Sequence, residues 1–352
     1  TRAIYNYIQA GFTYKALEFG PRANIPNKVS QIIQNKYGDC KDLALLAFHM
    51  RQSLGISSHL ALVNTERNLI KSLPSMDQFD HMILYLPDYD EGRFVDCTSR
   101  HASLDLSTPP GLTDRDILVL DQKIPRILNS GTHLSSENQI YSEKKVLIEG
   151  DNLTVEETLT FQGVPSADFR FYLGTLHGEE LLSSLQSLIS ATTGTHAQLQ
   201  DVKHSKNPDP NSPLTVTFKY VVPKAIKSID GNIVISEIPT IWEKYYLKVP
   251  YVKDRITPFS VRFPFQFSSV VSLNYSSSFH VAAKDLSNLK VENDFHQFTI
   301  ETKLDARNRT LVRESKVTLN RNEHPPVRFH EFQESAHELL SAMANSVTLE
   351  SF

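Results

Sequence analysis

The sequence predicts an α+β protein with two domains, and three observations lead to this expectation. The chain has 352 residues, enough for two domains of about 100–200 residues each. Helical and extended patterns alternate up to about residue 130, whereas β-type runs dominate after it. Between them, the stretch from Pro109 to about Gln139 carries Pro, Asp and Ser residues typical of a connector. We therefore expect a first domain over residues 1–135 and a β-rich domain over residues 136–352, with room for two subdomains.

The composition is typical of a globular protein and narrows the expected partners. Hydrophobic residues make up 40% and charged residues 22%, so the chain can bury a core. The formal net charge of -4 comes without long blocks of one sign, so neither nucleic acid nor an anionic membrane is expected as a partner. No apolar run reaches the roughly 20 residues that cross a bilayer, so no membrane-spanning segment is expected. The start at Thr1, without an initiator Met, suggests a processed chain and leaves the compartment open.

Three helices are expected in the first domain. Apolar residues recur at helical spacing near residues 4–8 and again over residues 29–33, after Pro26. The strongest pattern runs from Asp39 to Leu54 and ends at Gly55, a residue type that favours the backbone conformation of helix ends. Its apolar residues form one stripe: Leu43, Leu46, Ala47, Met50 and Leu54. This helix is expected to bury one side.

Three extended runs follow, and the last two are expected to form a hairpin. The runs are His59–Asn64, His81–Leu86 and Phe94–Thr98. The segment 87–92, rich in Pro, Asp and Gly, is expected to be the turn between the second and the third. A hairpin that pairs the turn residues Pro87 and Asp90 places His81 opposite Asp96, to within one or two residues.

The second domain is expected to be sandwich-like or barrel-like, with one or two helices. An apolar helical face over residues 181–189, closed by Gly194, and an amphipathic stretch from about Phe329 to Ala344 predict these helices. Six runs are candidate strands: Lys145–Glu149, Thr154–Gln162, Leu214–Tyr220, Val261–Phe267, Phe298–Thr302 and Thr310–Thr318. We find no chemical motif in this half.

Cys40, His81 and Asp96 are the candidate catalytic residues. Cys40 lies where a Gly-containing loop enters the predicted helix 39–54, and the partial positive charge of a helix N-terminus stabilises a thiolate. His81 at the start of a strand is the expected general base, and Asp96 would hold its imidazole in the reactive tautomer. Directly opposed residues of a hairpin have Cβ atoms about 5 Å apart, which allows a hydrogen bond between this Asp and this His.

An ordered set of motifs carries a family resemblance. The segment Tyr37-Gly38-Asp39-Cys40-Lys41-Asp42 precedes the apolar helix, Leu54-Gly55-Ile56 and Ala61-Leu62-Val63-Asn64-Thr65 follow it, and Phe79-Asp80-His81 and Phe94-Val95-Asp96-Cys97-Thr98 complete the set. Over about residues 1–135 the chain resembles the bacterial branch of the transglutaminase-like superfamily. The remainder is more loosely similar to the β-rich region that follows the core in multidomain members, which usually carry a β-rich domain before the core as well. Asp80 and Cys97 stand where the family often has Asn and Pro, and neither difference removes a triad group.

The resemblance implies a papain-like core with a Cys40, His81 and Asp96 triad that acts on peptide or protein amides through a thioester. If water attacks the thioester, the chain is a protease, amidase or deamidase. If an amine attacks it, the chain is a transglutaminase. Hydrolysis is favoured. The backbone N–H of Cys40 is one expected oxyanion donor. Tyr14 matches a tyrosine common upstream in the family and is the candidate second donor, with Gln31 and Gln34 as papain-like alternatives. Because multidomain relatives are commonly exported, a periplasmic or secreted location is favoured.

Three other interpretations of the sequence are less favoured. Cys97, with His101 nearby, is a less favoured nucleophile because a strand cysteine lacks a helix dipole. No metal or cofactor is expected, since metal-ligand spacing, calcium loops and phosphate-binding glycine patterns are missing from the sequence. The alternative to an enzyme is a noncatalytic module on the same fold that binds protein or polysaccharide. The sequence indicates no particular oligomeric state.

Overall fold

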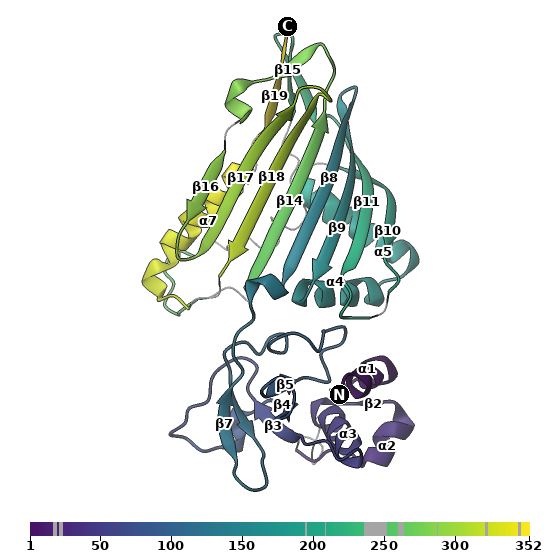
Figure 1. Cartoon of the computed structure of the whole chain (residues 1–352), viewed down its shortest axis with the longest axis vertical. Coiled ribbons are helices and arrows are strands. Elements are labelled where there is room, and N and C mark those ends of the chain that lie inside the picture. The colour runs from purple at the N-terminus through teal and green to yellow at the C-terminus, as the bar shows by residue number, and fades with distance from the viewer. Residues whose placement is uncertain are drawn as a thin grey trace. The chain divides into compact units, whose positions relative to one another are not determined.

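The computed structural model describes residues 1–16, 20, 24–193, 196–207, 209–235, 252–259, 264–286, 288–320, 323–343 and 346–352. They form two compact units. The first unit contains Thr1–Leu134, Ser166–Phe171 and Asp209–Asn211. The second contains Ser135–Pro165, Tyr172–Pro208 and Ser212–Phe352. The architecture is α+β and rich in sheet (Figure 1).

The first unit packs three helices and a five-stranded sheet, with a short parallel pair of strands beside the helices. The sheet order is β5-β4-β3-β6-β7. The helices are α1 (Arg2–Gly11), α2 (Val29–Asn35) and α3 (Cys40–Ser53), and the strands are β1 (Thr13–Tyr14), β2 (Tyr37–Gly38), β3 (His59–Val63), β4 (His81–Leu86), β5 (Arg93–Val95), β6 (Asp116–Val119) and β7 (Arg126–Asn129). The three predicted helices are thus confirmed. The predicted connector is partly wrong, because β6 and β7 form within it and extend the sheet beyond β3.

Apolar residues cover both faces of this sheet. On one face, Leu84 and Val95 pack in a cluster with Leu43 and Leu46 of α3 and Ile8 of α1. On the other face, alternate residues of the same strands form a second cluster, which includes Ala61, Ile83, Tyr85, Phe94 and Ile117. The alternation of side chains along a strand explains why neighbouring residues belong to different clusters. The sheet therefore provides a rigid support for the residues at the ends of β4 and β5.

The β4–β5 hairpin forms with a register that differs from the predicted one by two residues. Leu84 pairs with Val95 and Leu86 with Arg93, so the centre of the turn lies one residue further along the chain than expected. Asp90, Glu91 and Gly92 all have positive φ, which makes the turn longer and more irregular than a tight two-residue reversal. Ladder pairing ends at Val95, and Asp96 follows it outside the strand.

The second unit is built on an eight-stranded sheet with the order β10-β11-β9-β8-β14-β18-β17-β16. Its strands are β8 (Gln139–Glu149), β9 (Asn152–Gln162), β10 (Gln198–His204), β11 (Leu214–Val222), β14 (Phe265–Asn274), β16 (Leu289–Glu292), β17 (His296–Asp305) and β18 (Thr310–Leu319). All pairs are antiparallel except β8 with β14. A four-stranded sheet has the order β12-β13-β19-β15 and contains β12 (Ile226–Ile229), β13 (Asn232–Ile235), β15 (Phe279–Val281) and β19 (Val347–Ser351).

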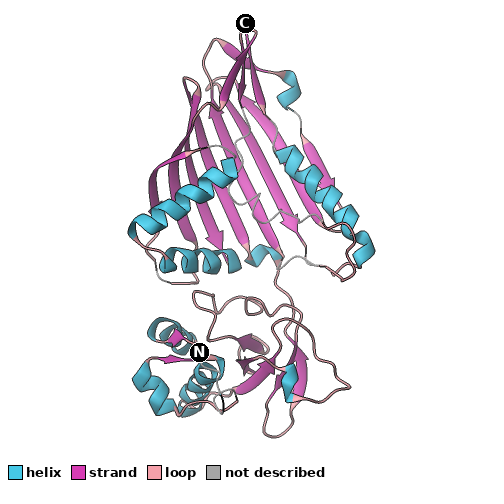
Figure 2. Cartoon of the chain, turned by 180° about the vertical axis from the view of Figure 1, so that it is seen from behind, coloured by secondary structure: helices cyan, strands magenta, loops and turns pink. Residues whose placement is uncertain are grey.

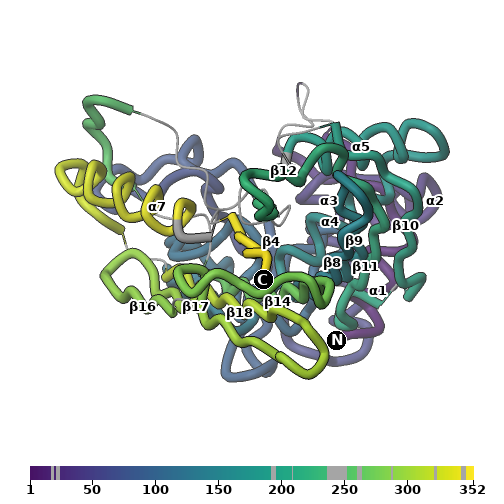
Figure 3. Tube along the Cα trace, turned by 90° about the horizontal axis from the view of Figure 1, so that it is seen from above, coloured from purple at the N-terminus to yellow at the C-terminus, as the bar shows by residue number. Residues whose placement is uncertain are grey.

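Helices cover one face of the large sheet, so the predicted sandwich-like arrangement is wrong. Helices α5 (Gly178–Thr193) and α7 (Phe329–Met343) lie on the same face (Figure 2, Figure 3). Side-chain hydrogen bonds fix them, because Gln186 of α5 accepts from the backbone N–H of Leu199 and Ser335 of α7 accepts from the side-chain amide of Asn293. Both helices were predicted. Helix α4 (Val164–Thr175) was not, since it lacks a strong amphipathic pattern.

Most predicted strands of this unit are confirmed, with longer bounds. The first two predicted strands lie in β8 and β9, and the last two lie in β17 and β18. Of the predicted strand Val261–Phe267, residues 261–263 lie outside the described residues, and β14 begins at Phe265. Ala344, the predicted end of the last helix, also lies outside them.

Candidate active site

Cys40 is the first residue of α3, and the backbone before it is fixed on both sides. Asp39 is the N-cap, and a capping box joins its carboxylate to the backbone N–H of Asp42 and the carboxylate of Asp42 back to the N–H of Asp39. Strand β2, which ends at Gly38, pairs in parallel with β1. A Cβ on Gly38 would lie 2.6 Å from the Cβ of Asp42, so only glycine fits this close approach. Cys40 itself is 5% exposed.

His81 is the first residue of β4, and Asp80 fixes this strand end to β3. The backbone N–H of Asp80 donates to the carbonyl oxygen of Val63 at 3.2 Å. Its carboxylate accepts from the backbone N–H of Thr65 at 2.9 Å and from the Thr65 hydroxyl at 3.0 Å. These contacts account for Asp80 at the position before His81 and restrict how the His81 backbone can move.

Asp96 directly follows β5 and receives hydrogen bonds on both carboxylate oxygens. Oδ2 lies 2.9 Å from Nε2 of His81 and accepts from the Ser99 hydroxyl at 3.1 Å. Oδ1 accepts from the backbone N–H of Thr98 at 2.8 Å and from its hydroxyl at 2.7 Å. Gln9 of α1 supports this loop by donating to the Ser99 carbonyl oxygen at 2.8 Å. Asp96 is therefore buried, oriented and ionised.

Charge pairing decides the protonation of His81 and Asp96. Burial alone would lower the pKa of His81, but the charge and hydrogen bond of Asp96, with a hydrogen bond to Cys40, outweigh burial and raise the pKa to about 10. Burial likewise opposes ionisation of Asp96, yet His81 and the two Thr98 donors lower its pKa. His81 is thus an imidazolium at neutral pH. Because Nε2 faces Asp96, Nδ1 is the ring nitrogen left for the Cys40 thiol.

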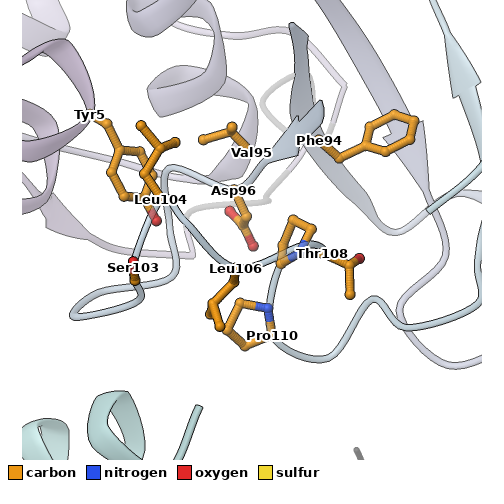
Figure 4. Close-up of a pocket in the computed structure, with 10 residues that line it drawn as sticks. Tyr5, Phe94, Val95, Asp96, Ser103, Leu104, Leu106, Thr108 and Pro110 are labelled. Carbon is orange, nitrogen blue, oxygen red and sulfur yellow. The ribbon is translucent and has the colours of Figure 1, made fainter. Parts of the chain in front are cut away.

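The cavity beside Asp96 is too small for a substrate. Figure 4 shows Tyr5, Val95 and Leu106 around the Asp96 carboxylate, and the cavity volume is about 10 Å³. That volume holds about one water molecule. A larger cavity of about 370 Å³ lies in the second unit, and residues that line it include Leu147, Ile233 and Phe279.

The other sequence candidates differ in where the structure places them. Tyr14 pairs with Gly38 across the parallel β1–β2 ladder, two residues before Cys40, and is 45% exposed. Gln31 and Gln34 are on α2 and are exposed. Cys97 is buried in the apolar cluster that contains Leu84, and burial together with Asp96 raises its pKa strongly, which disfavours its thiolate. Neither cysteine forms a disulfide.

Several residues that support the site were not anticipated from the sequence. Lys41 is buried in an ion pair with Asp39, Asn27 holds Asp42, and Gln9 holds the loop after Asp96. The role of Thr98 could have been predicted from the sequence, since an Asp side chain commonly forms a local turn with the residue two positions after it. For Gln9 and Asn27 the sequence holds no such signal, because their partners are 15 or more positions away.

Neither a metal-binding group nor a membrane-spanning helix is found within the described part of the chain. No three His, Cys, Asp or Glu side chains among the described residues are arranged to hold a metal ion. None of the helices among these residues is long and apolar enough to cross a bilayer.

The fold resembles that of a solved structure. No family model and no curated protein matches this sequence. The crystal structure of a protein described as a "putative protease" from Parabacteroides distasonis ATCC 8503 matches with a TM-score of 0.55 and 12% sequence identity. The match covers 100% of this chain and 51% of the other, so this chain spans about half of that protein's length. At this identity the likeness shows the fold alone.

Proposed function

We propose that this chain is a transglutaminase-like cysteine enzyme with a papain-like core, which acts on peptide or protein amide bonds through Cys40, His81 and Asp96. The observation that carries the proposal is the hydrogen-bonded series from Cys40 at a helix N-terminus to His81 and on to Asp96. A nucleophile bonded to a base that a third group orients is the arrangement used in covalent catalysis. The description of the structural neighbour as a "putative protease" agrees with this proposal.

The protonation of His81 suggests how the first half-reaction proceeds. An imidazolium at neutral pH pairs with a Cys40 thiolate, which attacks the amide carbonyl carbon and forms a C–S bond. The backbone N–H of Cys40 and, in this proposal, Tyr14 stabilise the oxyanion. His81 then gives its proton to the leaving nitrogen as the C–N bond breaks, which leaves a thioester and a free amine.

The second half-reaction decides the product. Neutral His81 takes a proton from the incoming nucleophile as it attacks the thioester, and the Cys40 thiolate leaves. Water gives a carboxylic acid, and an amine gives a new amide. We favour water, because the solved structure with a similar fold is described as a "putative protease".

The experiment is mass spectrometry of a glutamine-containing protein substrate incubated with the chain and a labelled primary amine. The variants Cys40→Ala and Cys97→Ala are compared, since Cys97 is the other thiol of the chain. We expect cleaved or deamidated substrate with the parent chain and with Cys97→Ala, and none with Cys40→Ala. Cys40-dependent label incorporation would instead indicate a transglutaminase. Without any Cys40-dependent product the proposal fails in favour of the noncatalytic binding module.

A further inference from the structure

The N-terminus of α3 buries three charged side chains next to Cys40. Asp39 and Asp42 are fully buried, and Lys41 is only 4% exposed. Charged side chains are almost never fully buried unless they are paired. The partners of these three residues therefore show what the cluster does for Cys40.

Asn27 donates two hydrogen bonds to Asp42. The backbone N–H of Asn27 donates to Oδ1 at 2.7 Å, and the side-chain amide of Asn27 donates to Oδ2 at 3.1 Å. The backbone N–H of Asp39 lies farther away, at 3.4 Å from Oδ2. These donors orient the Asp42 carboxylate.

A buried cation holds Asp39. One carboxylate oxygen accepts from the backbone N–H of Asp42, and the other lies 2.5 Å from Nζ of Lys41. Helical side chains point back toward the N-terminus, which lets Lys41 reach Asp39 from the second position of the helix. The helix dipole opposes a cation in the first turn, so this placement is unfavourable unless the cation neutralises a carboxylate.

The charge balance around Cys40 depends on this lysine. Like charges nearby disfavour a buried thiolate. At the N-cap and in the first turn of α3 the charged groups are Asp39, Lys41 and Asp42, and from the sheet His81 faces Cys40 with Asp96 behind it. On the β1–β2 side, Nζ of Lys15 lies over the Tyr37 ring, 4.6 Å from its centre. Without the Lys41 ammonium, the buried Asp39 carboxylate directly before Cys40 would lose the cation that pairs with it.

We propose that Lys41 is a positioning residue for Cys40: its ammonium group neutralises Asp39 within the capping box, so that the N-terminus of α3 can stabilise the Cys40 thiolate. The inference rests on the proposed function, because it gives Lys41 a part in activating the same nucleophile.

Three variants test this inference. Lys41→Met removes the charge with a side chain of similar length, and Lys41→Arg keeps the charge. Asp39→Asn removes the opposite charge, and Asn is as good an N-cap as Asp. The measurement is the rate of Cys40 alkylation by iodoacetamide between about pH 5 and about pH 9, read by peptide mapping that separates Cys40 from Cys97. Urea unfolding of each variant reports its stability.

The two neutral variants are expected to shift the alkylation profile in opposite directions. At about pH 6, Lys41→Met should react about tenfold more slowly and Asp39→Asn several-fold faster, whereas Lys41→Arg should stay within about threefold of the parent. Both neutral variants break the same buried ion pair and lower the free energy of unfolding. A role in folding alone would therefore affect both in the same way. Shifts in the same direction, or an unchanged Lys41→Met profile, would overturn the inference.

Two outcomes separate this inference from the proposed function. If Cys40 of the parent chain reacts no faster than a model thiol at about pH 6, the proposed function fails and the inference fails with it. If the parent reacts fast and Lys41→Met reacts equally fast, only the inference fails. Should Lys41→Met not fold, Asp39→Asn decides, because it changes the net charge of the cluster in the opposite direction. Faster alkylation at about pH 6 supports the inference, and an unchanged or slower rate overturns it.

Discussion

Each of the two units buries a lysine–carboxylate pair, and the two pairs have different surroundings. In the first unit, Lys41 and Asp39 flank a cysteine at a helix N-terminus. In the second, Nζ of Lys144 lies 3.6 Å from Glu157 across the β8–β9 ladder, and both side chains are fully buried.

The second pair belongs to a polar network without a nucleophile. Glu157 also accepts from the Ser142 hydroxyl at 2.9 Å and from the Tyr220 hydroxyl at 3.1 Å. Burial, reinforced by the charge of Glu157, raises the pKa of Tyr220 well above its usual range, so this hydroxyl stays a donor. Both cysteines of the chain lie in the first unit. Buried charge alone therefore does not mark a reactive site. In the proposed function, the combination with a helix-end thiol and an imidazolium does.

The largest expected effect comes from His81→Gln, which removes the proton donor of the proposed reaction. The Cys40-dependent rate should fall about a hundredfold to ten-thousandfold, the usual range for losing a general acid or base. The measurement is kcat/KM on the substrate identified by mass spectrometry. His59→Gln is the matched control, since His59 lies on the adjacent strand, where it contacts Asp121 at 3.9 Å and stacks on the ring of Tyr85. Equal losses in both variants would remove the distinction between the two histidines.

The next largest effect is expected for the buried ion pair of the second unit. Lys144→Met leaves Glu157 buried without its cation and should lower the free energy of unfolding by about 3–5 kcal/mol. Urea unfolding measures this loss, and the alkylation rate of Cys40 should stay unchanged. Lys145→Met is the control, because its side chain is 68% exposed and its ion pair contributes little. If Lys144→Met altered Cys40 reactivity in the folded protein, the comparison between the two pairs would be wrong.

Stability should also depend on pH through His81. Its pKa is about 10 in the folded state and near 6.5 unfolded, so the His81–Asp96 pair contributes fully below about pH 6.5 and is lost as pH rises toward 10. Over that window the free energy of unfolding should fall by up to a few kcal/mol more than in His81→Gln. On the acid side, the lowered pKa of Asp96 means that stability is lost as pH falls below the usual aspartate range. Denaturant unfolding at several pH values measures both slopes, and identical slopes in the variant would contradict the pairing.

The smallest effect is expected from Gly38→Ala. The added Cβ would overlap the Cβ of Asp42 and displace the capping box, at a cost of about 1–3 kcal/mol in stability. Alkylation of Cys40 should slow as well, because the helix start moves. Gly11→Ala is the control, since its Cβ would meet only Tyr7 at 4.0 Å. Thermal unfolding of both variants measures the difference, and a Gly38→Ala variant as stable as Gly11→Ala would show that the helix start has more room than the structure indicates.

Helices and strands could be predicted from the sequence where the pattern that specifies them lies within a few neighbouring residues. Apolar periodicity predicted α1, α2, α3, α5 and α7 and most long strands, because burial of one face imposes the helical or alternating pattern on nearby residues. It also predicted that Cys40 begins a helix and that His81 begins a strand, since capping and turn residues act within a few positions.

How segments far apart in the sequence pack together could not be predicted and is seen only in the folded structure. The sequence suggested a sandwich, but helices cover the large sheet, because any apolar surface can bury an apolar strand face and the pattern does not say which. It placed the hairpin two residues out of register, because an irregular turn shifts the pairing. The burial of Lys41 and the raised pKa of His81 likewise depend on partners and on a low-dielectric surrounding that exist only once the chain has folded.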